Sequence, residues 1–263
     1  MADPPTVELL QASVDLEDED SYFRFLVNGN TIKYLTVAPG MLAPGDMAFS
    51  PTLLAFLPPF PPGDWNEARV SLDSTTGRPH FETWTHRDLP GITSIWHADK
   101  FDHLQLHIGE KLRSAVYSAV IPPTKQGVVK LAIFDWQIDA LDHETTAYHW
   151  IEGQDIGPAF RGHVTEHGRV IGFLMDRIAD ARRGGPEDLE VCQAVLGRLH
   201  GLGLKHGDVN RHNFLIHDGR ATMIDFEGTR RCEDPAELAE EMASLAQQLS
   251  DESGLGGVIT TAS

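Results

Sequence analysis

Cysteine is scarce in this chain of 263 residues, which contains only Cys192 and Cys232. Two cysteines cannot build the disulfide framework of a small secreted protein, and they are too few for a structural zinc site. The first residues also lack the basic and apolar segments of a secretory signal peptide. These absences favour a reducing compartment, and we expect a cytoplasmic protein.

Long apolar runs are missing as well. The most apolar early stretch, residues 47–60, is interrupted by Pro51, Pro58 and Pro59. A membrane-spanning helix needs about 20 consecutive, mostly apolar residues, and proline interrupts its hydrogen bonding. We therefore expect no membrane partner.

Basic residues are outnumbered, since 21 Lys and Arg face 39 Asp and Glu and the net charge is −18. This balance disfavours an extended nucleic-acid surface, although a local basic patch for a tRNA is compatible with it. The 13 histidines form no tetrahedral pattern with cysteine or carboxylate, and the Gly-x-Ser-x-Gly elbow of a serine nucleophile is absent. The composition leaves the oligomeric state open.

Hydrophobic periodicity predicts a chain in two parts. Residues 21–37 alternate apolar and polar side chains around an Asn-Gly turn, which predicts a β-hairpin. Residues 38–97 are rich in Pro, Gly and Trp, so we expect an irregular extension that serves as a lid, as a substrate-selecting element or simply as packing. The later pattern is regular. It predicts strands over residues 104–108, 115–121, 127–134, 157–166, 169–178, 214–216 and 221–225, and helices over residues 142–151, 186–203 and from residue 234.

Three polar residues in the last third of the chain form a pattern with chemical meaning. Asp208 is followed five residues later by an amide, Asn213, and a short hairpin then leads to a second acid, Asp225. Phosphoryl transfer needs a carboxylate that orients or deprotonates a hydroxyl, and an amide with a carboxylate that hold Mg²⁺. We predict these roles for Asp208 and for Asn213 with Asp225, and expect His206 to brace the loop. A hairpin with incidental acids is the alternative.

The segment His-Gly-Asp-x-x-x-x-Asn-Phe-Leu-Ile, followed by Ile-Asp-Phe-Glu, resembles the catalytic core of the protein-kinase-like superfamily. It is closer to the aminoglycoside-phosphotransferase and small atypical-kinase branches. Gly207 stands where most protein kinases have Arg, and Glu227 stands where their metal-binding triplet ends in Gly. The similarity covers about residues 104–250 and looks most like small kinase-like fungal proteins of uncertain function.

This resemblance implies an α+β, two-lobe fold with a minimal C-terminal lobe. Residues 1–100 would form an irregular, partly β extension, residues 101–178 the N-terminal lobe and residues 179–263 the C-terminal lobe. The chain has no room for the activation segment and large helical subdomain with which ordinary protein kinases grip peptides. A small-molecule acceptor is therefore expected.

The resemblance also implies that Lys130, which lies inside an apolar strand, pairs with Glu144 and steadies the α- and β-phosphates of a nucleotide. A lysine that reaches solvent beside an unrelated glutamate is the alternative interpretation. Met175 and Ile178 would line an adenine pocket, or would only belong to the buried core.

Residues 109–114 stand where kinase-like folds place a glycine-rich loop over the phosphates. Lys111 and Ser114 replace two of its glycines, so the backbone approaches phosphates less freely. The side chains of Lys111, Arg113 and Ser114 could make the contacts instead. An ordinary hairpin is the alternative.

The leading hypothesis is an ATP- and Mg²⁺-dependent phosphotransferase that acts on a hydroxyl or amine of a small molecule, as a step of a biosynthetic pathway. A second hypothesis keeps the fold but changes the reaction to another group transfer or condensation, with an activated donor such as aminoacyl-tRNA, because a fold does not fix a function. A third is a pseudokinase-like binding module.

Overall fold

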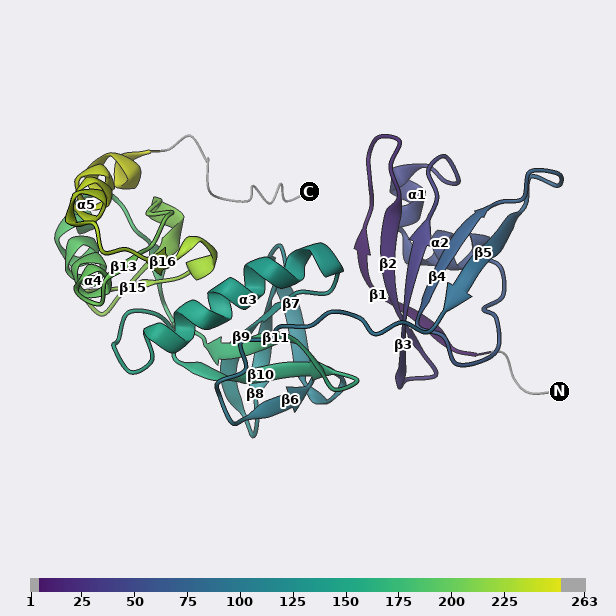
Figure 1. The fold of residues 1–263 in the computed structure, drawn as a ribbon, viewed down its shortest axis with the longest axis horizontal. Helices are drawn as coiled ribbons and strands as arrows, with labels where there is room; N and C mark the ends of the chain where they lie inside the picture. The colour runs from purple at the N-terminus through teal and green to yellow at the C-terminus, as the bar shows by residue number, and fades with distance from the viewer. Residues whose placement is uncertain (1–4, 252–263) are drawn as a thin grey trace. The chain divides into compact units, whose positions relative to one another are not determined.

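The computed structural model of this chain describes residues 5–251. The chain divides into two compact units, residues 1–89 and residues 90–263 (Figure 1). It combines helices with mixed sheets, so the α+β prediction is confirmed. None of the helices in the described part is both long and apolar enough to cross a membrane.

The boundary between the two units falls after Leu89, whereas the sequence predicted a boundary after residue 100. Residues after Leu89 are tied to the second unit by hydrogen bonds. The backbone N–H of Ile92 donates to the carbonyl of Val170 (2.8 Å), and the N–H of Thr93 donates to the Asp142 carboxylate (2.9 Å).

The first unit is a five-stranded sheet in the order β1-β2-β3-β4-β5, antiparallel except between β3 and β4. Two short helices make the crossover that this parallel pair requires, and their apolar residues join the core under the sheet. The hairpin predicted over residues 21–37 is confirmed as β2 and β3. The elements are β1 (Val7–Ser13), β2 (Ser21–Val27), β3 (Thr31–Val37), α1 (Pro44–Ala48), α2 (Ser50–Phe56), β4 (Glu67–Leu72) and β5 (Pro79–Thr85).

The Pro-rich region that follows this hairpin is more regular than predicted. Pro44 and Pro51 fall in the first turns of α1 and α2, where the missing N–H would have had no helical partner in any case. Trp65 is buried in the core, and its indole N–H donates to the carbonyl of Pro61 (2.8 Å). The prolines therefore begin helices here and do not exclude them.

The second unit begins with a six-stranded sheet in the order β6-β10-β11-β9-β8-β7. The helix α3 (Asp135–Trp150) packs against it and buries Ile138, Leu141, Ala147 and Tyr148 in the core of this unit (Figure 1). The helix begins before the predicted residue 142, because the Gln137 side chain accepts the N–H of Phe134 (3.1 Å) and caps its first turn. The strands are β6 (Lys100–Asp102), β7 (His107–Arg113), β8 (Val116–Ile121), β9 (Lys125–Leu131), β10 (Phe160–Glu166) and β11 (Arg169–Asp176).

The segment compared with a glycine-rich loop belongs to a β-hairpin, which was the alternative interpretation, but its bounds differ from those predicted. The strand predicted over residues 104–108 begins instead in a 3-10 helix, η1 (His103–Gln105). Most of the loop predicted over residues 109–114 belongs to the strand β7. The β7–β8 pairing is irregular around Lys111. A Cβ atom at Gly109 would lie 2.5 Å from the Ser118 hydroxyl oxygen. This glycine therefore allows the two strands to pack closely at Ser118.

The rest of the second unit is built from two helices and short strands. Helix α4 buries Cys192, Val195, Leu196 and Leu199 at the predicted spacing. Helix α5 begins after Asp234, whose carboxylate accepts the N–H of Ala236 (2.9 Å). The elements are β12 (Arg182–Arg183), η2 (Pro186–Asp188), α4 (Leu189–Gly201), β13 (Leu204–Lys205), η3 (Arg211–Asn213), β14 (Phe214–His217), β15 (Arg220–Met223), η4 (Phe226–Gly228), β16 (Arg230–Arg231) and α5 (Pro235–Ser250).

Candidate active site

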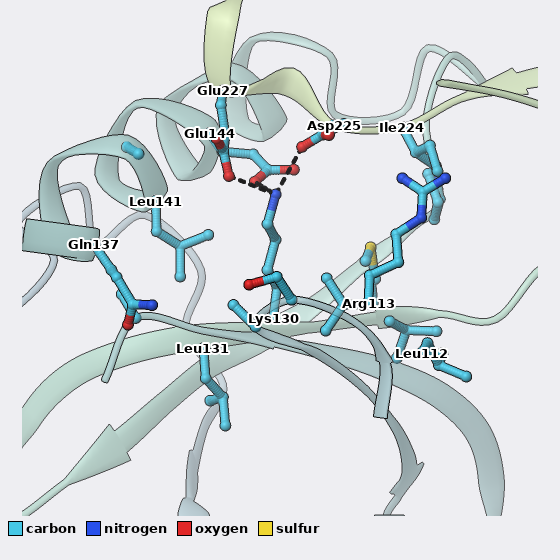
Figure 2. A pocket seen from close by; sticks show the side chains of 18 of the residues that line it. Leu112, Arg113, Lys130, Leu131, Gln137, Leu141, Glu144, Ile224, Asp225 and Glu227 are labelled. Atoms are coloured by element: carbon cyan, nitrogen blue, oxygen red, sulfur yellow. Dashed lines mark hydrogen bonds and ion pairs between the residues drawn. The ribbon is translucent and has the colours of Figure 1, made fainter. Parts of the chain in front are cut away.

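A cavity of about 560 Å³ opens in the second unit. Its walls come from β7, β8 and β9, from α3, from the end of β11 and from residues 224–227 (Figure 2). This volume lies in the range of pockets that enclose small molecules. The charged side chains of the cavity are therefore the first candidates for chemistry.

Three carboxylates surround the ammonium group of Lys130 on β9. Its Nζ atom lies 2.6 Å from Glu144, 2.8 Å from Asp225 and 2.8 Å from Glu227 (Figure 2). Glu144 projects from α3, while Asp225 and Glu227 follow β15. The ion pair that the resemblance implied between Lys130 and Glu144 is present, and its extension to Glu227 was not predicted.

This network holds more negative than positive charge; Lys130 and Glu144 are buried, Asp225 is partly buried and Glu227 is exposed. Burial lowers the pKa of Lys130, but the three carboxylates outweigh that effect and raise it, so the ammonium stays protonated. Burial raises the pKa of Glu144, against the opposing effect of Lys130. For Asp225 burial also acts upward, yet Lys130 brings the net pKa below its usual value. Asp225 is therefore ionised at neutral pH.

The backbone at Asp225 is in the left-handed region, with φ 69° and ψ 64°. This conformation costs about 1–2 kcal/mol for a residue with a Cβ atom, and surrounding packing must hold it in place. The next residue, Phe226, is fully buried and packs edge-on against Tyr148 at 5.2 Å between ring centroids. Its N–H also points to the Glu144 carboxylate (3.3 Å). Phe226 thus fixes the segment so that Asp225 meets Lys130.

The loop that carries Asp208 lies between β13 and β14. The exposed Asp208 carboxylate accepts hydrogen bonds from the side-chain amides of Asn210 (2.8 Å) and Asn213 (3.0 Å). The backbone carbonyl of Asn213 accepts the N–H of Ile224 (3.0 Å), so this loop adjoins the Asp225 segment. Asn213 Oδ1 is buried and has no hydrogen-bond partner among residues 5–251.

His206 connects the same two segments through its ring. The N–H of Asp208 donates to Nδ1 (3.3 Å), and Nε2 lies 3.2 Å from the carbonyl of Ile224. A neutral imidazole with its proton on Nε2 satisfies both contacts. Burial lowers the pKa of His206 and keeps the ring neutral. His206 therefore braces the loop, as predicted.

Glu241 on α5 holds the start of this loop, and sequence reasoning missed it. Its carboxylate accepts the backbone N–H groups of His206 (3.1 Å) and Gly207 (2.7 Å), and it meets His200 Nε2 at 2.8 Å. Glu241 is only 6% exposed. The sequence did contain a signal for this role: Glu241 lies among the apolar positions of the predicted helix, and a buried acid requires hydrogen-bond partners.

Gly207 is required by the space around the loop. Its φ is +86°, and a Cβ atom there would lie 2.6 Å from the carbonyl oxygen of Gly228. The arginine that most protein kinases have at this position would meet the same carbonyl. The glycine noted in the sequence therefore allows the loop and residue 228 to pack closely.

The structure brings some of the predicted site residues together and leaves others apart. Seven of them line the cavity: Arg113, Ser114, Lys130, Glu144, Met175, Ile178 and Asp225. Lys111 is exposed on β7 and does not line it. Asp208 and Asn213 lie outside the lining, on the loop that adjoins residue 224. Arg183 lines the cavity and was not predicted, since a residue of a two-residue strand carries no periodic signal.

Comparison with known proteins gives local matches only, and no protein-family model matches the chain. The chain is 42% identical over 41 residues to a probable bifunctional tRNA threonylcarbamoyladenosine biosynthesis protein of Methanoculleus marisnigri, covering 16% of this chain and 8% of that protein. A protein of the same description from Methanospirillum hungatei is 46% identical over 41 residues, again covering 16% and 8%. The RIO-type serine/threonine-protein kinase Rio1 of Haloferax volcanii is 37% identical over 60 residues, 21% of each chain.

The matched segments therefore span between 8% and 21% of the length of these curated relatives. One of the relatives is a protein kinase by description. The chain thus carries a short stretch of kinase-like sequence.

Proposed function

We propose that the second unit is an ATP- and Mg²⁺-dependent phosphotransferase that acts on a hydroxyl or amine of a small molecule. The observation that carries this proposal is the ion pair between Lys130 and Glu144, which meets Asp225 at the wall of a cavity. A buried lysine held between carboxylates offers an ammonium donor to the phosphates of a nucleotide, and an acid beside it suits a metal ion. The short similarity to a RIO-type kinase supports the same class of reaction.

Nucleotide binding would use the apolar end of the cavity and its lysine. Met175 and Ile178 line that cavity at the end of β11 and just beyond it, where an adenine ring would pack. Lys130 would exchange part of its contact with carboxylates for contact with phosphate oxygens. Glu144 would keep the ammonium group in position during this exchange.

Magnesium would be held by Asn213 and Asp225. Mg²⁺ prefers hard oxygen ligands. The buried Oδ1 of Asn213 lacks a hydrogen-bond partner among the described residues, and Asp225 is ionised, so both fit. When bound, the ion neutralises charge on the transferred phosphoryl group.

Asp208 would orient the acceptor and take its proton. Its exposed carboxylate is held by two amide side chains, and this fixes its direction without covering it. Only residues 226–234 separate Asp225 from α5. That length leaves no place between them for a long peptide-gripping segment, which favours a small acceptor.

A thermal-shift titration tests the nucleotide and metal assignments together. ATP with Mg²⁺ at 100 times its dissociation constant stabilises a folded protein by about 2.7 kcal/mol. We expect this shift in the unaltered protein and in Asp208→Asn, and no Mg²⁺-dependent shift in Asp225→Ala. Both substitutions should abolish phosphoryl transfer, while Glu240→Ala, which removes an exposed carboxylate from α5, should behave as the unaltered protein.

Two results would contradict the proposal. A melting temperature that does not change when ATP and Mg²⁺ are added would favour another group transfer in this cavity. Nucleotide turnover that survives Asp225→Ala would remove the metal assignment and the phosphotransferase with it.

A further inference from the structure

Two arginines meet at one carbonyl beside the candidate active site. Arg113 at the end of β7 and Arg183 on β12 both line the cavity. Their guanidinium groups donate to the same oxygen, the backbone carbonyl of His212, at 3.2 Å and 2.6 Å. Figure 2 shows the Arg113 side chain extending from the sheet towards the segment that carries Ile224 and Asp225. Because they share one acceptor, the two guanidinium groups are close neighbours.

Neither arginine has a carboxylate within ion-pair distance in the part of the chain that the structure describes, although Asp225 attracts both from further away. No carboxylate of residues 5–251 forms an ion pair with Arg113 or Arg183, although the chain has an excess of acids. Arg182, the neighbour of Arg183, is by contrast paired with Asp188. Each guanidinium has five N–H donors, so one shared carbonyl leaves most of them available to a ligand.

Holding these two cations together is unfavourable without an anion. Burial lowers the pKa of Arg113, and burial with the repulsion from Arg113 lowers the pKa of Arg183 to about 10; attraction by Asp225 opposes both shifts without cancelling them. Both groups are still charged at neutral pH. An anion between them would relieve the repulsion and replace lost hydration with charge-assisted hydrogen bonds.

We propose that Arg113 and Arg183 form an anion clamp that binds an anionic group, such as a phosphate, on the acceptor substrate. The clamp is made of other residues than the network of Lys130 with its three carboxylates, in which negative charge exceeds positive charge, although both line the same cavity. The shared carbonyl belongs to His212, four residues after Asp208 in the same loop. A group held there is anchored on the loop that receives the acceptor. The planar guanidinium fork suits phosphate oxygens better than a lysine ammonium does.

Inorganic phosphate is the probe that tests this clamp, and calorimetric titration at constant ionic strength measures its affinity. Arg183→Ala and Arg113→Ala should each weaken phosphate binding about tenfold or more, since each removes hydrogen bonds to a charged group. Arg183→Lys keeps the charge but loses the fork, so an intermediate loss is expected. Arg220→Ala removes an exposed positive charge from β15 and should leave the affinity unchanged.

A saturating non-hydrolysable ATP analogue separates the acceptor from the nucleotide as the source of the anion. The acceptor assignment, which rests on the proposed function, predicts that phosphate still binds beside the analogue and that Arg183→Ala leaves ATP affinity unchanged. Competition between analogue and phosphate, with weaker ATP binding in Arg183→Ala, would assign the clamp to the nucleotide and overturn the proposal. Phosphate binding that is equal in all variants would also overturn it. Phosphate binding that depends on both arginines without any ATP binding would retain the clamp while removing the proposed function.

Discussion

Removing the Glu241 carboxylate tests how the loop with Asp208 is held in place. In the structure both carboxylate oxygens are used, one by the N–H of Gly207 and the other by the N–H of His206 and by His200. Glu241→Ala leaves two backbone amides without their acceptor. An unsatisfied buried donor costs about 1–3 kcal/mol. The His206 amide is buried, whereas Gly207 is exposed and its amide can turn to water, so the loop should lose about 1–3 kcal/mol of local stability. That is a large share of the 5–15 kcal/mol typical of a whole domain.

Amide hydrogen exchange, read by mass spectrometry on peptides that cover residues 202–214, measures this loss locally. The middle of this range, about 2 kcal/mol, corresponds to about a 30-fold change in an equilibrium constant, so the amides of His206 and Gly207 should exchange about that much faster if they exchange by local opening. Glu240→Ala is the matched control, because it makes the same change of helix propensity on an exposed position of α5. Glu241→Gln keeps the shape and one acceptor, so its effect should be intermediate.

The pH dependence of the same experiment provides a second check. Burial raises the pKa of Glu241, but its hydrogen bonds from His200 and the two amides outweigh burial and bring the pKa below the usual 4.5. A carboxyl whose pKa is depressed by folding stabilises the protein above its unfolded pKa and loses that contribution as the pH falls. The difference between the unaltered protein and Glu241→Ala should therefore shrink below about pH 4.5. Loop exchange in Glu241→Ala equal to that in Glu240→Ala at neutral pH would refute the reasoning.

Two further predictions concern backbone space and a buried histidine. Gly207→Ala should destabilise the second unit by more than Gly219→Ala in urea unfolding, because both have positive φ but only position 207 places a Cβ atom 2.6 Å from a carbonyl oxygen; equal losses would argue against that contact. Burial lowers the pKa of His163 from 6.5 to about 4, so the unfolded chain binds its proton first and stability should fall by up to about 3 kcal/mol as the pH drops between these values. His163→Gln should lack that part of the pH dependence, and identical slopes for both proteins between pH 7 and pH 4.5 would contradict the assignment.

Local signals in the sequence predicted much of the fold of the second unit. The three- and four-residue spacing of Cys192, Val195, Leu196 and Leu199 predicted α4, and Asp234 marked the start of α5. These predictions succeeded because each depends on residues within a few turns of one another. Lys130 and Asp225 are 95 residues apart, so the order Lys130, Glu144, Asp225 pointed to the network at the cavity only through the resemblance.

Other features could not be predicted because they depend on contacts between distant segments. The register of β7 is set by its bulged pairing with β8, and Gly109 packs against Ser118 where a phosphate loop was expected. The role of Glu241 depends on a hydrogen bond to Gly207, 34 residues away in the chain. The pair Arg113 and Arg183 exists only because two separate strands end at the same carbonyl.

The sequence by itself determined which residues we propose for the chemistry: a lysine, a glutamate, two aspartates and an asparagine in a recognisable order. The tertiary structure alone decided which of these share a cavity, how many carboxylates Lys130 meets, and that two arginines lie side by side. The physical reason is that composition and short-range spacing fix the chemical groups and local backbone preferences, whereas the distance between charges on separate elements depends on how those elements pack. Electrostatic energy depends on that distance and on burial, so the charges and the protonation of the site become defined only in the folded chain.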